Sequence, residues 1–187
     1  LVSSVDFSRS PYKITIDEKK VVLADSVIIA TGATPKRLGL ESEHQYSGHG
    51  VSAWATCDGF FFKGEDVAIV GGGDTAAEEA LHLSRLCRKV YMVVRKSDFK
   101  ASRTMINRVE NACNIEIRFN VEVKEILGDG THVNGVQLFN NSTLEETQLN
   151  ISGLFLAIGH RPNTEVFKAW IDTPMPGEIA TAVEWAN

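Results

Sequence analysis

The sequence contains few cysteines, and none of them forms a closely spaced pair. The three are Cys57, Cys87 and Cys113. This odd and scattered set excludes a disulfide framework and favours a reducing compartment, so we expect a cytoplasmic protein. The five histidines also lack the spacing of a metal site, and we predict no bound metal.

Long apolar runs and an excess of positive charge are missing as well. The longest apolar stretches, 67–70 and 154–158, are too short to span a bilayer, and the first ten residues do not resemble a secretory signal. A net charge of −5 argues against a nucleic-acid binder. We therefore predict no membrane and no nucleic-acid partner. Because the sequence does not start with methionine, we expect a piece of a longer protein.

Apolar runs and glycine-rich turns alternate in a regular order along the middle of the chain. They predict an α/β fold with a Rossmann-like parallel sheet, helices on both faces and a small antiparallel β-meander over residues 121–152. Partial strands of another domain are expected at the edges of this fold. The expected strands are 21–23, 26–30, 66–70, 89–94, 115–119 and 154–158, and the expected helices are 74–88 and 103–112.

A glycine-rich turn follows the expected strand 66–70 and opens a helix. It reads Gly71-Gly72-Gly73-Asp74-Thr75-Ala76, a G-x-G-x-x-A pattern. Gly71 permits a tight turn, Gly73 lets a pyrophosphate approach the backbone, and Ala76 lets the helix pack close to the strand. The helix N-terminus offers free N–H groups to the phosphates. The sequence therefore predicts a dinucleotide-binding site.

Positive charge follows the next strand, where an NAD-binding site would carry an acidic residue. Here the chain reads Val94-Arg95-Lys96-Ser97-Asp98-Phe99-Lys100. Arg95, Lys96 and Lys100 suit a 2′-phosphate, which guanidinium and ammonium groups bind by charge-assisted hydrogen bonds. The run predicts NADPH rather than NADH.

A short segment, Ser52-Ala53-Trp54-Ala55-Thr56-Cys57-Asp58-Gly59, places a carboxylate directly after a cysteine. Thiol chemistry that cycles through a disulfide needs a second thiol nearby. The position three residues before Cys57 holds Trp54 instead. We expect Phe60-Phe61-Phe62, which follow, to anchor the turn to the core.

Four stretches together resemble the low-molecular-weight thioredoxin reductases, and the resemblance runs from residue 1 to about residue 168. It implies a homodimeric flavoprotein that moves electrons from NADPH through FAD to an active-site dithiol and on to thioredoxin. The stretches are Ala30-Thr31-Gly32-Ala33, 51–61, 71–80 and 153–164.

The resemblance also assigns roles to individual residues. In the family's C-A-T-C-D motif, Cys57 is the flavin-facing cysteine and Asp58 the acid/base. Trp54 occupies the position of the thioredoxin-facing cysteine, so we expect the chain to be inactive as given. The resemblance assigns Gly71, Gly73 and Thr75 to the pyrophosphate, Arg95, Lys96 and Lys100 to the 2′-phosphate, and Ile158 to the nicotinamide side. The other predicted cofactor-binding residues are Gly72, Asp74, Gly159, and Thr31 and Gly32 in the flavin-domain turn.

The same resemblance predicts three segments: 1–46 from the FAD domain, 47–165 as the NADPH domain, and 166–187 as the return to the FAD domain with an atypical tail. The family's main FAD motifs do not occur in residues 1–187, so tight FAD binding is not expected. Two alternatives stay open. One is a dithiol-free NADPH-dependent flavoprotein, either ferredoxin–NADP reductase-like or an NADPH oxidase. The other is a non-catalytic NADPH-binding module.

Overall fold

The computed structural model describes residues 1–171 and divides the chain into two compact units. The smaller unit combines Leu1–Thr34 with His160–Asn187, and the larger unit is Pro35–Gly159. The sequence predicts the corresponding boundaries further along the chain, after residues 46 and 165. Most of the atypical tail, 172–187, lies outside the described residues.

A five-stranded parallel sheet forms the centre of the larger unit. Its spatial order is β5, β12, β6, β7, β8, so the strand order reverses between β12 and β6. Val67, Ile69, Val90 and Met92 have no exposed surface, which explains why these short apolar runs form central strands. The strands are β5 (Val51–Ser52), β12 (Gly153–Leu156), β6 (Asp66–Val70), β7 (Lys89–Val94) and β8 (Ile115–Phe119).

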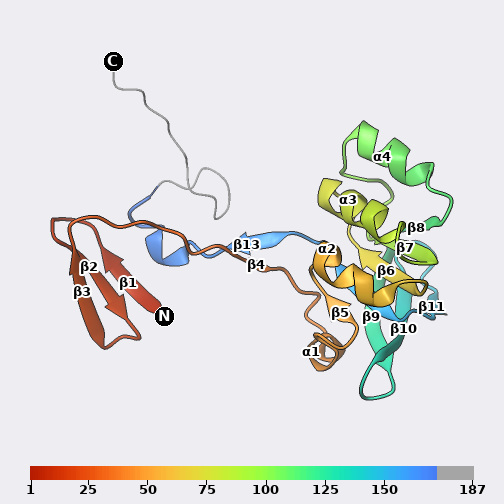
Figure 1. Cartoon of the computed structure of the whole chain (residues 1–187), viewed down its shortest axis with the longest axis horizontal. Coiled ribbons are helices and arrows are strands. Elements are labelled where there is room, and N and C mark those ends of the chain that lie inside the picture. The colour runs from red at the N-terminus through yellow and green to blue at the C-terminus, as the bar shows by residue number, and fades with distance from the viewer. Residues whose placement is uncertain (172–187) are drawn as a thin grey trace. The chain divides into compact units, whose positions relative to one another are not determined.

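Helices α3 (Asp74–Leu83) and α4 (Arg103–Glu110) cover one face of this sheet (Figure 1). Small side chains on α3, such as Ala76, Ala77 and Ala80, let the helix lie close to β6 and β7. The helix ends at Leu83, five residues before its predicted end. The Asn114 amide donates hydrogen bonds to the carbonyls of Ser84 (2.8 Å) and Cys87 (3.2 Å), which stabilises the turn that leads into β7.

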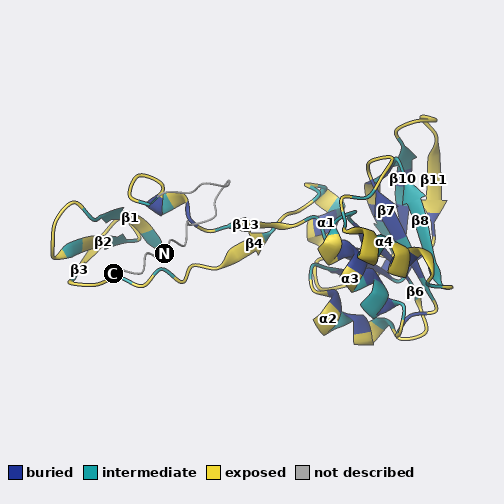
Figure 2. Cartoon of the chain, turned by 90° about the horizontal axis from the view of Figure 1, so that it is seen from above, coloured by how far each residue is buried: buried dark blue, intermediate teal, exposed yellow. Residues whose placement is uncertain are grey.

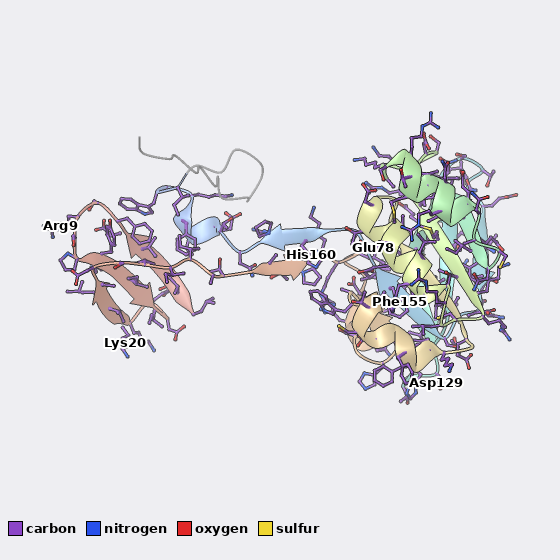
Figure 3. All side chains as sticks on the ribbon, turned by 45° about the horizontal axis from the view of Figure 1, so that its top comes forward. Arg9, Lys20, Glu78, Asp129, Phe155 and His160 are labelled. Carbon is purple, nitrogen blue, oxygen red and sulfur yellow. The ribbon has the colours of Figure 1, made fainter. Side chains whose placement is uncertain are left out.

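The opposite face is covered by the antiparallel sheet of β9 (Val121–Gly128), β10 (Val133–Asn140) and β11 (Glu146–Leu149), together with the short helix α1 (Glu41–Gln45). Buried residues concentrate between these two layers and the helices (Figure 2). Phe155 on β12 lies fully inside the larger unit, whereas Glu78 lies on the outer side of α3 (Figure 3).

The predicted fold class is therefore confirmed, and the structure refines one detail of it. The β-meander, rather than a long helix, covers most of the second face of the parallel sheet. Its alternating apolar side chains, including Val121, Val123 and Val136, supply the buried surface that the strands require.

The smaller unit contains an antiparallel sheet of β1 (Val2–Asp6), β2 (Tyr12–Ile16) and β3 (Lys20–Ala24). The Phe7 ring lies 5.3 Å from Tyr12, 6.0 Å from Trp170 and 6.4 Å from Phe167 of the 3-10 helix η2 (Glu165–Phe167), measured between centroids. The strands β4 (Ala33–Pro35) and β13 (His160–Pro162) pair with each other.

One predicted strand, 26–30, does not form. Ile28 is 93% exposed, and no described strand lies beside this segment to accept its backbone hydrogen bonds. None of the helices in residues 1–171 is long and apolar enough to cross a membrane.

Candidate functional site

The glycine-rich turn between β6 and α3 has the geometry that its sequence predicts. Gly71 has a φ of +147°, and a Cβ at this position would lie 2.4 Å from the Ala157 carbonyl oxygen and 2.8 Å from the Ala76 Cβ. Only glycine fits there without a shift of the backbone. Gly73 is the N-cap of α3, and a Cβ built on it would meet nothing within 4 Å. The turn is therefore tight at Gly71 and open at Gly73.

The ends of three neighbouring strands meet at this turn. The Gly71 N–H donates to the Val93 carbonyl (3.1 Å), and the Ala157 N–H donates to the Val70 carbonyl (2.9 Å). Because the strands are parallel, the segments that follow β12, β6 and β7 lie side by side at one edge of the sheet.

A cavity of about 1030 Å³ opens at this edge, at the upper end of the size range typical of ligand pockets. It collects nine of the predicted cofactor-binding residues from three separate stretches of sequence. They are Gly71, Gly72, Gly73, Thr75, Arg95, Lys96, Lys100, Ile158 and Gly159.

Sequence reasoning missed the lining residues that come from the meander and from the linker after β4, residues 36–40. These segments pack on the face of the parallel sheet opposite α3 and α4. No local sequence pattern indicates that they extend to the edge where the cavity lies. In the sequence, Lys36 and Lys124 are single lysines, and nothing beside them indicates a binding site. The additional lining residues include Lys36, Arg37, Leu38, Leu40, Val121, Glu122, Val123, Lys124 and Phe139.

The described residues that line the cavity include six cations but only two carboxylates, Asp98 and Glu122. Two of the six cations are neutralised by partners outside the lining. Arg37 contacts the fully buried Glu43 (3.5 Å), and Lys124 pairs with Glu146. The structure shows no carboxylate partner within residues 1–171 for the other four, Lys36, Arg95, Lys96 and Lys100. Their positive charge is available to an anionic ligand.

Asp74 occupies the first turn of α3, but its carboxylate is held by α4. The Ser102 N–H (2.9 Å) and the Ser102 hydroxyl (2.7 Å) both donate to Asp74 Oδ1. These bonds, first the backbone one and then the side-chain one, lower the pKa of Asp74. The structure therefore gives Asp74 a bracing contact between the two helices, outside the lining of the cavity.

Thr31 and Gly32 belong to the smaller unit and are not among the residues that line the cavity. The Asn163 N–H donates to the Gly32 carbonyl (3.0 Å), and the Asn163 side-chain amide donates to the Thr31 carbonyl (3.0 Å). Gly32 has a φ of +64°, which suits a turn. Asn163 is thus a structural partner of this turn that sequence reasoning did not single out.

The cysteine segment folds as α2 (Ala55–Asp58) followed by the 3-10 helix η1 (Gly59–Phe62). Trp54 is the N-cap of α2, and its carbonyl accepts hydrogen bonds from the N–H groups of Cys57 (3.1 Å) and Asp58 (2.9 Å). The Ser52 hydroxyl donates to Asp58 Oδ2 (2.6 Å) and accepts from the Trp54 N–H (2.9 Å). Ser52, which the sequence did not mark, therefore orients the carboxylate.

The three thiols differ in their surroundings. Cys57 and Cys113 are exposed, whereas Cys87 is buried behind α3. Burial, helped by the charges of Asp66 and Glu65, raises the pKa of Cys87 to about 11. Cys87 is thus a packing residue, and its thiol is not available to Cys57.

The aromatic run after Cys57 behaves differently from the expectation. Phe62 does anchor the turn, since its ring lies 5.4 Å from that of Phe155, measured between centroids. Phe60 and Phe61, however, are 67% and 80% exposed, and the expectation that they face the core is wrong. A 3-10 helix has about three residues per turn, so the three successive rings point in different directions, and only that of Phe62 packs against the sheet.

Comparison with known proteins identifies the class. The profile of the family described as pyridine nucleotide-disulphide oxidoreductase matches residues 2–182. The chain therefore belongs to this family.

Many of the similar proteins are thioredoxin reductases, which confirms the resemblance drawn from the sequence motifs. The thioredoxin reductase of Buchnera aphidicola subsp. Baizongia pistaciae is 50% identical over 167 residues, which cover 88% of this chain and 51% of that protein. The protein of the same name from Escherichia coli O157:H7 is 41% identical over 176 residues, with coverages of 91% and 54%. The chain spans about half the length of these curated relatives.

Solved structures agree with the observed fold. Thioredoxin reductase from Giardia duodenalis has a TM-score of 0.81 at 43% identity, covering 88% of this chain and 54% of that one. The Streptococcus pyogenes enzyme has a TM-score of 0.87 at 32% identity, covering 98% and 60%.

Proposed function

We propose that the chain is the NADPH-binding part of a thioredoxin-reductase-type flavoprotein, which passes electrons from NADPH through FAD to a disulfide substrate. One observation supports this most directly. A glycine-rich turn and four cations that pair with no carboxylate of residues 1–171 line one cavity of about 1030 Å³. When bound, NADPH would supply the hydride for the reaction.

Three parts of the cofactor would contact residues at the ends of three different strands. Gly73 and the uncapped N–H groups of α3 would receive the pyrophosphate, since no side chain blocks their approach. Arg95, Lys96 and Lys100, after β7, would bind the 2′-phosphate. Ile158, after β12, would lie beside the nicotinamide ring. Thr31 and Gly32 are proposed to belong to an FAD site of the parent protein.

A titration of the chain with NADPH and with NADH tests the cofactor assignment. We expect a preference for NADPH that Arg95→Ala reduces by about 10-fold, because one charge-assisted hydrogen bond is lost. The NADH affinity should change less than two-fold. Equal affinities for the two cofactors, unaffected by Arg95→Ala, would overturn the assignment. Arg108→Ala, on the exposed α4 and outside the cavity, serves as the control.

The cysteine segment, residues 52–59, is here named the redox turn, and it supports the disulfide-reductase chemistry only in part. Cys57 is exposed and Asp58 is oriented by Ser52, as an active thiol and its acid/base would need. A mixed disulfide between Cys57 and a substrate needs a second thiolate for its resolution. Trp54 stands where that thiol belongs, so we propose that the chain does not complete the cycle.

Trp54 also favours a second candidate, a flavoprotein that passes electrons on without a dithiol. Trp54→Cys in the full-length protein separates the two. The disulfide-reductase proposal predicts that this variant gains NADPH-dependent reduction of thioredoxin, with Trp54→Ser as the inactive control. A variant whose flavin is reduced normally but which never reduces thioredoxin would leave the dithiol-free candidate.

Exposed aromatic side chains are consistent with a protein substrate at this turn. Phe60 and Phe61 follow Cys57 within four residues and expose most of their surface. Such a patch beside a reactive group is typical of a protein-binding surface. Thioredoxin as the acceptor, a homodimeric parent and a cytoplasmic location stay predictions.

A further inference from the structure

Lys36 lies at the opposite end of the nucleotide cavity from the predicted 2′-phosphate cluster. Its backbone N–H donates to the Gly159 carbonyl (2.9 Å), which ties the linker to the segment after β12. A methyl group on Gly159 would lie 3.9 Å from Lys36 Nζ, so the ammonium group reaches the same segment. Arg95, Lys96 and Lys100 follow β7, on the far side of β6.

The position of the Lys36 ammonium group along the edge of the sheet determines which part of a dinucleotide it can contact. The order of the strands is β12, β6, β7, so the phosphate-binding turn after β6 lies between Lys36 and the Arg95 cluster. A dinucleotide with its 2′-phosphate after β7 and its pyrophosphate at the turn extends its nicotinamide half toward β12. The anionic group nearest to Lys36 is then the nicotinamide-side phosphate of the pyrophosphate.

Charge pairing separates Lys36 from its neighbours in the cavity. Arg37, the next residue, is engaged by Glu43, and Lys124 by Glu146. Lys36 has no carboxylate partner within the described part of the chain, residues 1–171. An ammonium group that lines a cavity without a counter-charge is available to neutralise a ligand phosphate.

We propose that Lys36 binds the pyrophosphate of the cofactor from the nicotinamide side and so contributes equally to the affinity for NADPH and for NADH. The inference rests on the proposed function. It adds a general dinucleotide contact to a cavity in which the Arg95 cluster discriminates between the two cofactors.

Lys36→Gln tests the inference, with NADPH, NADH and adenosine 2′,5′-bisphosphate as probes in separate titrations. We expect the affinities for NADPH and NADH to fall together by about 5- to 10-fold, the effect of one solvent-exposed charge-assisted hydrogen bond. The bisphosphate carries the 2′-phosphate but neither the pyrophosphate nor the nicotinamide half. Its affinity should stay within two-fold. Lys36→Arg should retain most of the NADPH affinity.

Lys124→Gln is the matched control, because Lys124 lines the same cavity but is paired with Glu146. It should change each affinity less than two-fold. Unchanged dinucleotide binding in Lys36→Gln overturns the inference while leaving the proposed function intact. A loss confined to NADPH and the bisphosphate also overturns it, since Lys36 would then act on the 2′-phosphate.

Lys36 also lines a smaller cavity of about 220 Å³ together with Trp54 and Asp58. A role there instead would appear as an altered alkylation rate of Cys57 in Lys36→Gln with normal cofactor binding, which counts against the inference. If the folded wild-type chain binds neither NADPH nor NADH, the proposed function fails and the inference fails with it. Thermal unfolding of each variant confirms that it is folded.

Discussion

The cavity at the glycine-rich turn and the redox turn differ in how many segments of the chain contribute residues to them. The cavity takes its lining from the linker after β4, the ends of β6, β7 and β12, and the meander strands β9 and β10. The redox turn is one continuous segment, in which Ser52, Trp54 and Asp58 are joined by local hydrogen bonds. A site with many contributors keeps its charge when one of them varies. A local site depends on each of its few residues, and here Trp54 stands three residues before Cys57.

The largest effect should follow from Gly71→Ala, which tests how strictly the cavity depends on its turn. The new Cβ would meet the Ala157 carbonyl oxygen at 2.4 Å, at a φ of +147°. We expect a loss of about 2–4 kcal/mol in the free energy of unfolding, measured with urea, and loss of NADPH binding.

Gly73→Ala is the matched variant, because its Cβ would enter open space and its φ of −96° is ordinary. It should keep the stability within about 1 kcal/mol while weakening NADPH binding, since the methyl group occupies the approach of the pyrophosphate. Similar stability losses in the two variants would contradict the difference in space around the two Cβ positions, which is crowded at Gly71 and open at Gly73.

The rates of thiol alkylation should differ between Cys57 in the redox turn and Cys87 in the core. With a pKa of about 11, Cys87 carries roughly one thiolate in a thousand at pH 8, and its side chain is buried. We expect iodoacetamide to modify Cys57 at least about 100-fold faster than Cys87, as followed by peptide mass spectrometry. The exposed Cys113 provides the internal control for an accessible thiol. Comparable rates at Cys57 and Cys87 would show that the core opens readily.

A smaller effect should come from Glu79 on α3, the helix that starts at the cavity and contacts α2. Glu79 Oε2 is buried without a hydrogen-bond partner in the described part of the chain. Burial, followed by the charge of Glu78, raises the pKa of Glu79 to about 7. The contribution of protonated Glu79 to stability is complete below its unfolded pKa near 4.5 and is lost as the pH rises through 7.

We therefore expect Glu79→Gln to raise the free energy of unfolding at pH 8, measured with urea, by about 1–2 kcal/mol after allowance for partial exposure. At pH 5 the difference from the wild type should be smaller. The exposed neighbour Glu78 provides the control variant, Glu78→Gln, with an expected effect below about 0.5 kcal/mol. A Glu79→Gln variant that is less stable at pH 8 would show that the carboxylate has a favourable partner.

Local patterns predicted much of the fold and of the cavity, for reasons visible in particular residues. The run Asp66–Val70, the glycines after it and the alanines of α3 carry their own conformational and packing requirements. Arg95 was assigned from its place after the second strand of the predicted nucleotide fold, and Ile158 from the family resemblance. Both residues line the cavity, because the ends of parallel strands meet at one edge of a sheet. The contribution of Lys36 and Phe139 could not be predicted, because it depends on where the linker and the meander pack.

The sequence by itself determined the order of the main strands and helices, the glycine-rich turn after β6, the cations after β7 and the presence of Trp54 three residues before Cys57. These features depend on residue type and short-range spacing. The tertiary structure decided which charges are available. It paired Arg37 and Lys124 with carboxylates and left Lys36 without one among the described residues. It also joined Asp74 to Ser102 and turned Phe60 and Phe61 outward. Charge pairing and exposure depend on distances between residues far apart in the chain, and only the packed structure sets these distances.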